Sequence, residues 1–333
     1  QPSHRAEQID PLDFWARHGA LVIRSGGQVR VAAAEQQMAW LLPGLACMLG
    51  NSGLLLRTAD WIPPRSRQFV AIASGGLELK RVVHHVQDIE EVAGFYKGCF
   101  GFCVMEGGTT SDGQPRALIG RPSVEGALCL ELIEAAGEAF RENGGYRGLS
   151  VRVANVGEAI AAAVPHGGKI IRGAETVEYG ASLFPDEPDD TTTPVLQAIA
   201  TDPGGYPILI YQGSDTDSNT CVDAVVSAIR LDVHEWKRSE EWYAETLGWH
   251  KLRWQSNVPR EASIVVTVGG AQTAVGPCGP TGDDQSAVVQ LRYVYSCPPI
   301  KQAGGLGALV LQGVDRAPPV GIREPDAYPL VFE

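Results

Sequence analysis

The sequence is short of positive charge and of closely spaced cysteines. It carries 27 Lys and Arg residues against 39 Asp and Glu, a formal net charge of −12, and such an acidic chain is repelled by phosphate backbones and anionic lipid headgroups. Nucleic acid and membrane surfaces are therefore not expected partners, and a small molecule is. No two of the seven cysteines form a CxxC pair, so we expect no thiolate zinc site, and a reducing compartment is favoured.

An uninterrupted apolar run is also missing from the N-terminal part, where a membrane-spanning helix would need about 20 apolar residues. The apolar stretch that begins at Met38 is interrupted by Pro43, Gly44, Gly50, Asn51 and Gly53. We predict that residues 1–78 are an N-terminal extension, and two interpretations stay open. Met38 starts a targeting leader of a protein that is soluble in an organelle such as the plastid, or the stretch is a native helix of a cytoplasmic protein.

A long-period repeat is the main feature that is present. The segments "VVHHVQDIEEVAGFYKGCFGF" and "AIRLDVHEWKRSEEWYAETLGW" share an acidic residue, an aromatic residue seven positions later, and an apolar-Gly-aromatic end. Asp88 and Phe95 thus correspond to Glu235 and Trp242, and the offset is 147 residues, the difference between 242 and 95. This repeat predicts two similar halves, residues 79–213 and 224–333, joined by a polar linker over residues 214–223.

Each half is predicted to contain strand-helix-strand units. In the first unit a valine-rich strand precedes Asp88, which with Glu91 is typical of a helix N-terminus, and Gly101 marks the end of that helix. "FCVME", "PRALIGRP" and "ALCLELIEA" then predict three strands, so the unit is βαβββ. A second unit begins at "YRGLSVRV" and has a helix from about Val156 to Val164. The units of the second half are less regular, and "VVQLRYV" is predicted to open the last of them.

The pair His84 and His85 lies on the first predicted strand. Because side chains alternate along a strand, His85 shares a face with Arg81 and Val83, while His84 points to the opposite face. The two rings therefore cannot bind one metal ion together. His84 is predicted to pack between helix and sheet; for His85, contact with a ligand and an ordinary hydrogen bond both stay open.

These motifs resemble the vicinal oxygen chelate superfamily, and most closely its tandem, two-domain glyoxalase I (lactoylglutathione lyase) proteins. The resemblance rests on "VQDIEEVAGFYKGCFGF", "ALCLELIEAAG", "YRGLSVRVANVGEAI", "HGGKIIRG", "DPGGYPILIYQ", "EWYAETLGW" and "EPDAYPLVFE", which span about residues 79–333. It implies an α+β fold of four βαβββ modules in two halves that form cupped mixed sheets with small-molecule sites. It also implies a monomer whose modules pair within one chain.

The activity implied by the resemblance is formation of lactoylglutathione from the methylglyoxal-glutathione hemithioacetal. Nickel or zinc would be held by His, Gln and Glu, and a metal-bound Glu would move a proton. Glu131 matches the carboxylate position and is the predicted catalytic residue; with Gln290 and Glu333 it forms the candidate metal-ligand set. The remaining ligand positions of the family hold residues that cannot bind a metal, namely Arg81, Gly148, Leu209, Ala228 and Val331.

Arg81, His85, Gln290 and Asp232 are the predicted ligand-binding residues. His85 stands where the family carries an arginine that contacts a glutathione carboxylate, and Asp232 is its counterpart in the second half, where an acidic residue argues against glutathione. Two sites follow from the resemblance. An outer site would hold Arg81, Glu131, Gln290 and Val331, with Arg81 and Glu131 as an ion pair in place of the metal; a middle site would hold Gly148, Leu209 and Ala228.

Two functions stay open at this point. The first is a glyoxalase I-like lactoylglutathione lyase that acts on a glutathione adduct with a divalent metal. The alternative is a non-catalytic small-molecule-binding or structural protein on the same fold, without a metal cofactor. The replaced ligand positions favour the alternative, and the overall resemblance favours the lyase.

Overall fold

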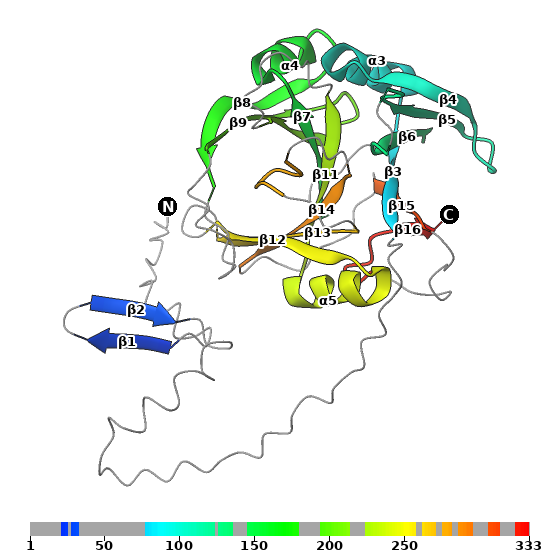
Figure 1. The fold of residues 1–333 in the computed structure, drawn as a ribbon. Helices are drawn as coiled ribbons and strands as arrows, with labels where there is room; N and C mark the ends of the chain where they lie inside the picture. The colour runs from blue at the N-terminus through cyan, green and yellow to red at the C-terminus, as the bar shows by residue number, and fades with distance from the viewer. Residues whose placement is uncertain are drawn as a thin grey trace, which may run out of the picture. The chain divides into compact units, whose positions relative to one another are not determined.

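The structure is a computed structural model (Figure 1). It describes residues 21–25, 28–32, 77–123, 126–135, 145–179, 194–213, 224–257, 262–270, 275–281, 286–295, 306–313 and 324–332. Met38, the predicted linker 214–223 and Glu333 lie outside the described residues. Two units divide the chain, Gln1–Phe69 and Val70–Glu333. In the first, β1 (Leu21–Ser25) and β2 (Gln28–Ala32) pair as an antiparallel ribbon.

The first half of the second unit forms the two predicted βαβββ modules. The first module consists of β3 (Glu78–Val86), α3 (Ile89–Phe100), β4 (Cys103–Thr109), β5 (Pro115–Gly120) and β6 (Cys129–Glu134). The second consists of β7 (Tyr146–Val153), α4 (Val156–Ala163), β8 (Lys169–Glu178), β9 (Pro194–Thr201) and β10 (Pro207–Gln212). Both helices begin and end within a residue or two of their predicted bounds.

The second half departs from the prediction in its last strands. The third module consists of β11 (Val225–Asp232), α5 (Trp236–Leu247), β12 (His250–Ser256), β13 (Ser263–Gly269) and β14 (Val288–Val294). "VVQLRYV" is therefore the closing strand of the third module, and the prediction that it opens the fourth was wrong. Within the described ranges the fourth module contributes β15 (Leu306–Gln312) and β16 (Leu330–Phe332).

Two mixed sheets combine strands from both halves. The eight-stranded sheet has the order β12-β13-β14-β11-β7-β10-β9-β8, and the six-stranded sheet has the order β16-β15-β3-β6-β5-β4. The halves meet where β11 pairs antiparallel with β7 and where β15 pairs antiparallel with β3. The α+β class, with glyoxalase-like modules in mixed sheets, is thus confirmed. No helix in these described ranges is long and apolar enough to cross a membrane.

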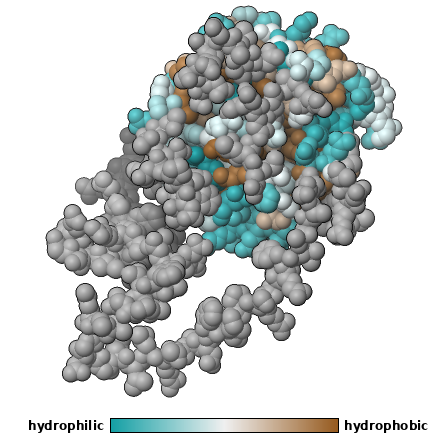
Figure 2. Space-filling model, in the orientation of Figure 1, coloured by the Kyte–Doolittle hydropathy of each residue, from teal (hydrophilic) through white to brown (hydrophobic). Residues whose placement is uncertain are grey.

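Local sequence explains why α3 forms where it does. The Asp88 side chain accepts a hydrogen bond from the backbone N–H of Glu91 at 3.0 Å, and Gly101 ends the helix in the left-handed conformation at φ 66°. Val92, Phe95, Tyr96 and Phe100 are buried, and each such side chain contributes about 1.5–3 kcal/mol by its transfer out of water. α3 packs against α4, whereas the outward face of α5 is hydrophilic (Figure 2).

His84 lies in the core between the sheets and the helices, as predicted. Its ring stacks on Tyr206 with centroids 3.9 Å apart, and its Nε2 atom lies 2.7 Å from the hydroxyl of Tyr146. Burial, with a smaller effect of the neighbouring His85, lowers the pKa of His84 to about 3. The neutral ring is therefore a structural group. Nearby, the buried carboxyl of Asp202 accepts hydrogen bonds from the Tyr206 backbone N–H at 2.9 Å and from the Tyr96 hydroxyl at 3.3 Å.

We expect the stabilising effect of Asp202 to depend on pH. Burial raises the pKa of Asp202 from 3.8 to about 7 in spite of these hydrogen bonds. The folded-state pKa lies above the unfolded value, so the protonated carboxyl contributes stability that is fully present below pH 3.8 and is lost as the pH rises through 7. Asp202→Asn should therefore cost less free energy of unfolding at pH 8 than at pH 5, as measured by urea denaturation.

The control for this experiment is Asp112→Asn, which removes an exposed carboxyl on a turn. Its effect should be small at both pH values. An Asp202→Asn variant that loses as much stability at pH 8 as at pH 5, or more, would contradict the prediction. His84 has the opposite sign, because its lowered pKa makes the wild-type protein lose stability as the pH falls from 6.5 toward 3; comparing each variant with wild type at the same pH cancels that effect.

Candidate functional site

The face of the six-stranded sheet opposite the helices carries the predicted ion pair. Arg81 on β3 and Glu131 on β6 lie with Nη1 and Oε2 3.4 Å apart. The second carboxylate oxygen of Glu131 lies 3.0 Å from Nη1 of Arg116 on β5, a partner that the sequence did not predict. Beside this cluster the same face is apolar, formed by Val83, Ala308, Val310 and Ile133. His85, also on this face, lies next to Gly307.

Gln290 is not part of this group, and its assignment to the outer site was wrong. It lies on β14 of the eight-stranded sheet, where it is opposite Arg230 in the parallel pairing of β14 with β11. Glu131 has the equivalent position in the six-stranded sheet, opposite Val83 in the parallel pairing of β6 with β3. The two residues therefore belong to different sheets, and they cannot bind one metal ion together.

The residues at the implied metal positions do not fit a divalent metal. In the six-stranded sheet Glu131 has its two oxygens beside two guanidinium groups, and the adjoining side chains are apolar. Glu333, the third candidate ligand, lies outside the described residues. In the described part of the chain no three His, Cys, Asp or Glu side chains group as a metal site would require.

The equivalent face of the eight-stranded sheet is partly filled by the segment 275–281, "VGPCGPT". Cys278 of this segment is buried against Leu209 and Tyr211 of β10. Leu209 occupies one of the ligand positions that the resemblance implies. Two arginines hold the backbone of the segment: Arg152 donates to the carbonyl of Pro280 at 3.5 Å and Arg253 to that of Val275 at 3.3 Å. We name this segment the plug. It fills space that the resemblance assigns to a metal site.

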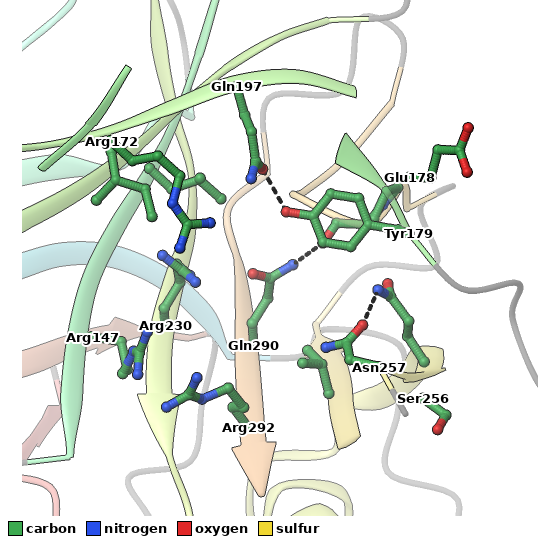
Figure 3. A pocket seen from close by; sticks show the side chains of 15 residues that line it. Arg147, Arg172, Glu178, Tyr179, Gln197, Arg230, Ser256, Asn257, Gln290 and Arg292 are labelled. Carbon is green, nitrogen blue, oxygen red and sulfur yellow. Dashed lines mark hydrogen bonds between the residues drawn. The ribbon is translucent and has the colours of Figure 1, made fainter. Parts of the chain in front are cut away.

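A cavity of about 180 Å³ remains beside the plug (Figure 3). Four arginines line it, each from a different strand: Arg147 on β7, Arg172 on β8, Arg230 on β11 and Arg292 on β14. In Figure 3 the side chains of Arg172 and Arg230 point toward one another. The remaining lining is mostly neutral and includes Tyr179, Gln197, Ile199, Leu209, Gln255, Asn257, Val265, Pro277 and Gln290.

Among the described residues, carboxylates contact three of these arginines but not the fourth. Arg292 binds Asp232 through two contacts of 2.7 and 3.1 Å, and Arg147 lies 3.8 Å from the same carboxylate. Arg172 pairs with Glu175 at 3.2 Å. Arg230 makes no hydrogen bond or ion pair with any residue that the structure describes. Burial, reinforced by the charge of Arg292, lowers the pKa of Arg230.

The uncharged part of the cavity lining, which we call the neutral wall, has side chains that are held in place by hydrogen bonds within the protein. The Tyr179 hydroxyl donates to Oε1 of Gln197 at 2.5 Å, and Nε2 of Gln290 donates to the carbonyl of Pro277 in the plug at 3.0 Å. Gln255 and Asn257 are joined at 2.7 Å. Side chains held in this way present fixed donors and acceptors to a ligand, and they lose little conformational entropy when it binds.

The comparisons with known proteins agree with this architecture. Residues 78–210 match the family model of the Glyoxalase/Bleomycin resistance protein/Dioxygenase superfamily. This segment is a glyoxalase-superfamily domain. Glyoxalase I from Zea mays has a similar crystal structure, with a TM-score of 0.56 and 20% sequence identity over 72% of this chain and 76% of that chain.

Two crystal structures of glyoxalase I mutants from Zea mays give TM-scores of 0.55, with the same identity and coverage. At this identity the likeness concerns the fold. The structural likeness covers 72% of the chain and so extends beyond the family-model match, which ends at residue 210. No curated protein matches the sequence.

Two of the cavity arginines could have been found from the sequence of this glyoxalase-like chain. Arg230 follows Ala228 by two positions, and Arg292 follows Gln290 by two, so strand alternation places each on the same face as an implied ligand position. Asp232, on the same face, was predicted to bind the ligand. In the structure Asp232 does not line the cavity; it holds Arg292 and Arg147, which do.

Proposed function

We propose that the protein is a non-catalytic small-molecule-binding protein of the glyoxalase fold, and that its ligand enters the cavity of the eight-stranded sheet. One observation carries the proposal. The cavity lies on the face where the resemblance implies a metal, yet its lining consists of guanidinium, amide, hydroxyl and apolar groups with a single carboxylate, Glu178. Such groups recognise an organic molecule by charge, hydrogen bonds and contact area. One carboxylate does not make a nickel or zinc site, and the described residues hold no group of three His, Cys, Asp or Glu side chains that would.

Lactoylglutathione lyase activity is the second candidate. It is favoured by the retained Glu131 at the carboxylate position and by the likeness in fold to glyoxalase I from Zea mays. Against it stand the two arginines on Glu131 and the separation of Gln290 from that residue in another sheet. A lyase of this class would require a metal with an open coordination position beside a carboxylate that is free to take a proton.

The assay that separates the two candidates is lactoylglutathione formation from methylglyoxal and glutathione, with nickel, zinc or magnesium added to the full chain. We expect no product above the uncatalysed rate with any of the metals, and metal analysis of the purified protein should give well under one equivalent. Circular dichroism shows that the sample is folded, and glyoxalase I from Zea mays serves as the positive control. Product formation together with one equivalent of bound nickel or zinc would overturn the proposal in favour of the lyase.

A further inference from the structure

We infer that the ligand of the cavity carries an anionic oxygen head group, a carboxylate or a phosphate, that binds Arg230 between the arginines of β7, β8 and β14. This inference rests on the proposed binding function and names the chemical class of the ligand. It does not follow from the overall charge, since a chain with a net charge of −12 would be expected to repel anions unless a local group of cations attracts them.

The charge balance of the cavity supports an anion. Four arginines line it, while the carboxylates that touch them are Asp232 and Glu175. Glu178, the one acidic residue in the lining, is exposed at the end of β8. Even when all three carboxylates are counted, the described residues of the cavity and their contacts carry one positive charge in excess. Arg230, which is partly buried, contacts none of these carboxylates, and a charge out of water without a contacting partner is costly.

The arrangement of the arginines also suits an anion. Asp232 receives two contacts from Arg292, a geometry that fixes the guanidinium plane. Arg292 lies on the strand next to Arg230, two residue pairs further along the register, since Arg230 is opposite Gln290 and Asp232 is opposite Arg292. The Arg172 side chain, which comes from β8, points toward Arg230 (Figure 3). An anion between these like charges would relieve their repulsion and form charge-assisted hydrogen bonds to a fork of donors.

Size and the neutral wall define the rest of the ligand. An apolar protein cavity of about 150 Å³ accommodates benzene, so about 180 Å³ suits a body of roughly one aromatic ring. Ile199, Leu209 and Val265 offer apolar contact to such a body, while Tyr179 and the amides of Gln197 and Gln290 offer hydrogen bonds. A glutathione adduct, which is a tripeptide conjugate, is larger than this space. The predicted class is therefore a small organic acid or phosphate ester.

Three probes of one size test this inference by isothermal titration calorimetry on the full chain. Phenyl phosphate and benzoate carry the two candidate head groups, and benzamide is their neutral counterpart. We expect at least one of the anions to bind with one-to-one stoichiometry and benzamide not to bind measurably; the tighter of the two anions identifies the head group. Arg230→Gln should weaken that binding by about 10- to 100-fold, because it removes a charged partner from a partly buried contact.

Arg238→Gln is the matched control, since it removes the same charge from the exposed face of α5; binding should change less than about twofold, as exposed charges are screened. Arg230→Lys keeps the charge but loses the planar set of guanidinium N–H donors. Its affinity for the anion should lie between those of wild type and Arg230→Gln. Failure of both anions to bind, or anion binding that Arg230→Gln leaves unchanged, overturns the inference. Equal binding of benzamide also overturns it but leaves the proposed binding function standing, whereas lactoylglutathione formation would remove that function itself.

Discussion

Gly148→His is expected to abolish stable folding instead of restoring a metal ligand at the position where the resemblance implies one. Gly148 lies on β7 with φ +86°, a left-handed conformation that costs a residue with a side chain about 1–3 kcal/mol. A Cβ atom added there would lie 1.7 Å from the carbonyl oxygen of Pro207 and 2.6 Å from its carbonyl carbon. These are backbone atoms of the neighbouring β10, so no side-chain rotation can relieve the overlap.

The close approach comes from the sheet itself. β7 pairs in parallel with β10, with Leu149 opposite Ile208, and Gly148 precedes this register by one residue. To admit a side chain, β7 and β10 would have to separate in the middle of the eight-stranded sheet. The strain and the overlap together are expected to exceed about 4 kcal/mol, a large share of the roughly 5–15 kcal/mol by which a native domain is stable, and the larger His side chain adds to this cost.

Gly148→Ala provides the measurable version of this prediction. We expect it to lower the free energy of unfolding by about 3 kcal/mol or more in urea denaturation. Gly173→Ala on β8 is the control, because no atom lies within 4 Å of its added Cβ and its φ is not in the left-handed region. That variant should be neutral or slightly stabilising. If Gly148→Ala changes stability by less than about 1 kcal/mol, the sheet is more adaptable than the structure indicates.

Features that depend on local pattern could be predicted from the sequence. The bounds of α3 follow from a capping aspartate and a left-handed glycine, and the structure has both. Strand alternation separates His84 from His85, and the core position of His84 follows from it. The pairing of Arg81 with Glu131 required more, namely the resemblance, because β3 and β6 are adjacent only once the module is known.

Features that depend on which strand pairs with which could not be predicted. "VVQLRYV" has the apolar, alternating character of any buried strand, so its sequence does not distinguish the last strand of one module from the first of the next. Because of this ambiguity Gln290 was predicted to lie beside Glu131, which is in the six-stranded sheet, whereas it lies in the eight-stranded sheet. The plug and the four converging arginines were missed for a related reason: they come from separate strands and one loop, and they meet only after the two halves have joined.

Glu131→Gln is expected to lower stability strongly, and this separates a structural role of Glu131 from a catalytic one. Glutamine has nearly the same shape, so a catalytic carboxylate could be replaced with little effect on folding. In this structure, however, the side chain of Glu131 is only 10% exposed and lies between Arg81 and Arg116, whose side chains are 19% and 28% exposed. Arg116 also pairs with the exposed Glu106, but removal of the Glu131 charge takes away the carboxylate that lies between the two guanidinium groups and leaves them facing each other with reduced access to water.

The expected loss is about 2–3 kcal/mol, somewhat less than the 3–5 kcal/mol typical of a fully buried pair, because the arginines keep some solvent contact. Glu134→Gln, three residues along the same strand and exposed, is the control and should change stability by less than about 0.5 kcal/mol. Urea denaturation at low and high salt measures both. The loss in Glu131→Gln should shrink at high salt, since screening weakens the repulsion between the arginines.

The change in the free energy of unfolding decides why position 131 holds a glutamate although the other implied ligand positions of this sheet hold residues that cannot bind a metal. If stability falls as expected, Glu131 is required by Arg81 and Arg116, and its presence says nothing about a metal. If Glu131→Gln is as stable as wild type, the two arginines do not depend on the carboxylate. Glu131 would then have no structural reason to be an acid, and the lactoylglutathione lyase assay with added metal would be the experiment to repeat on this variant.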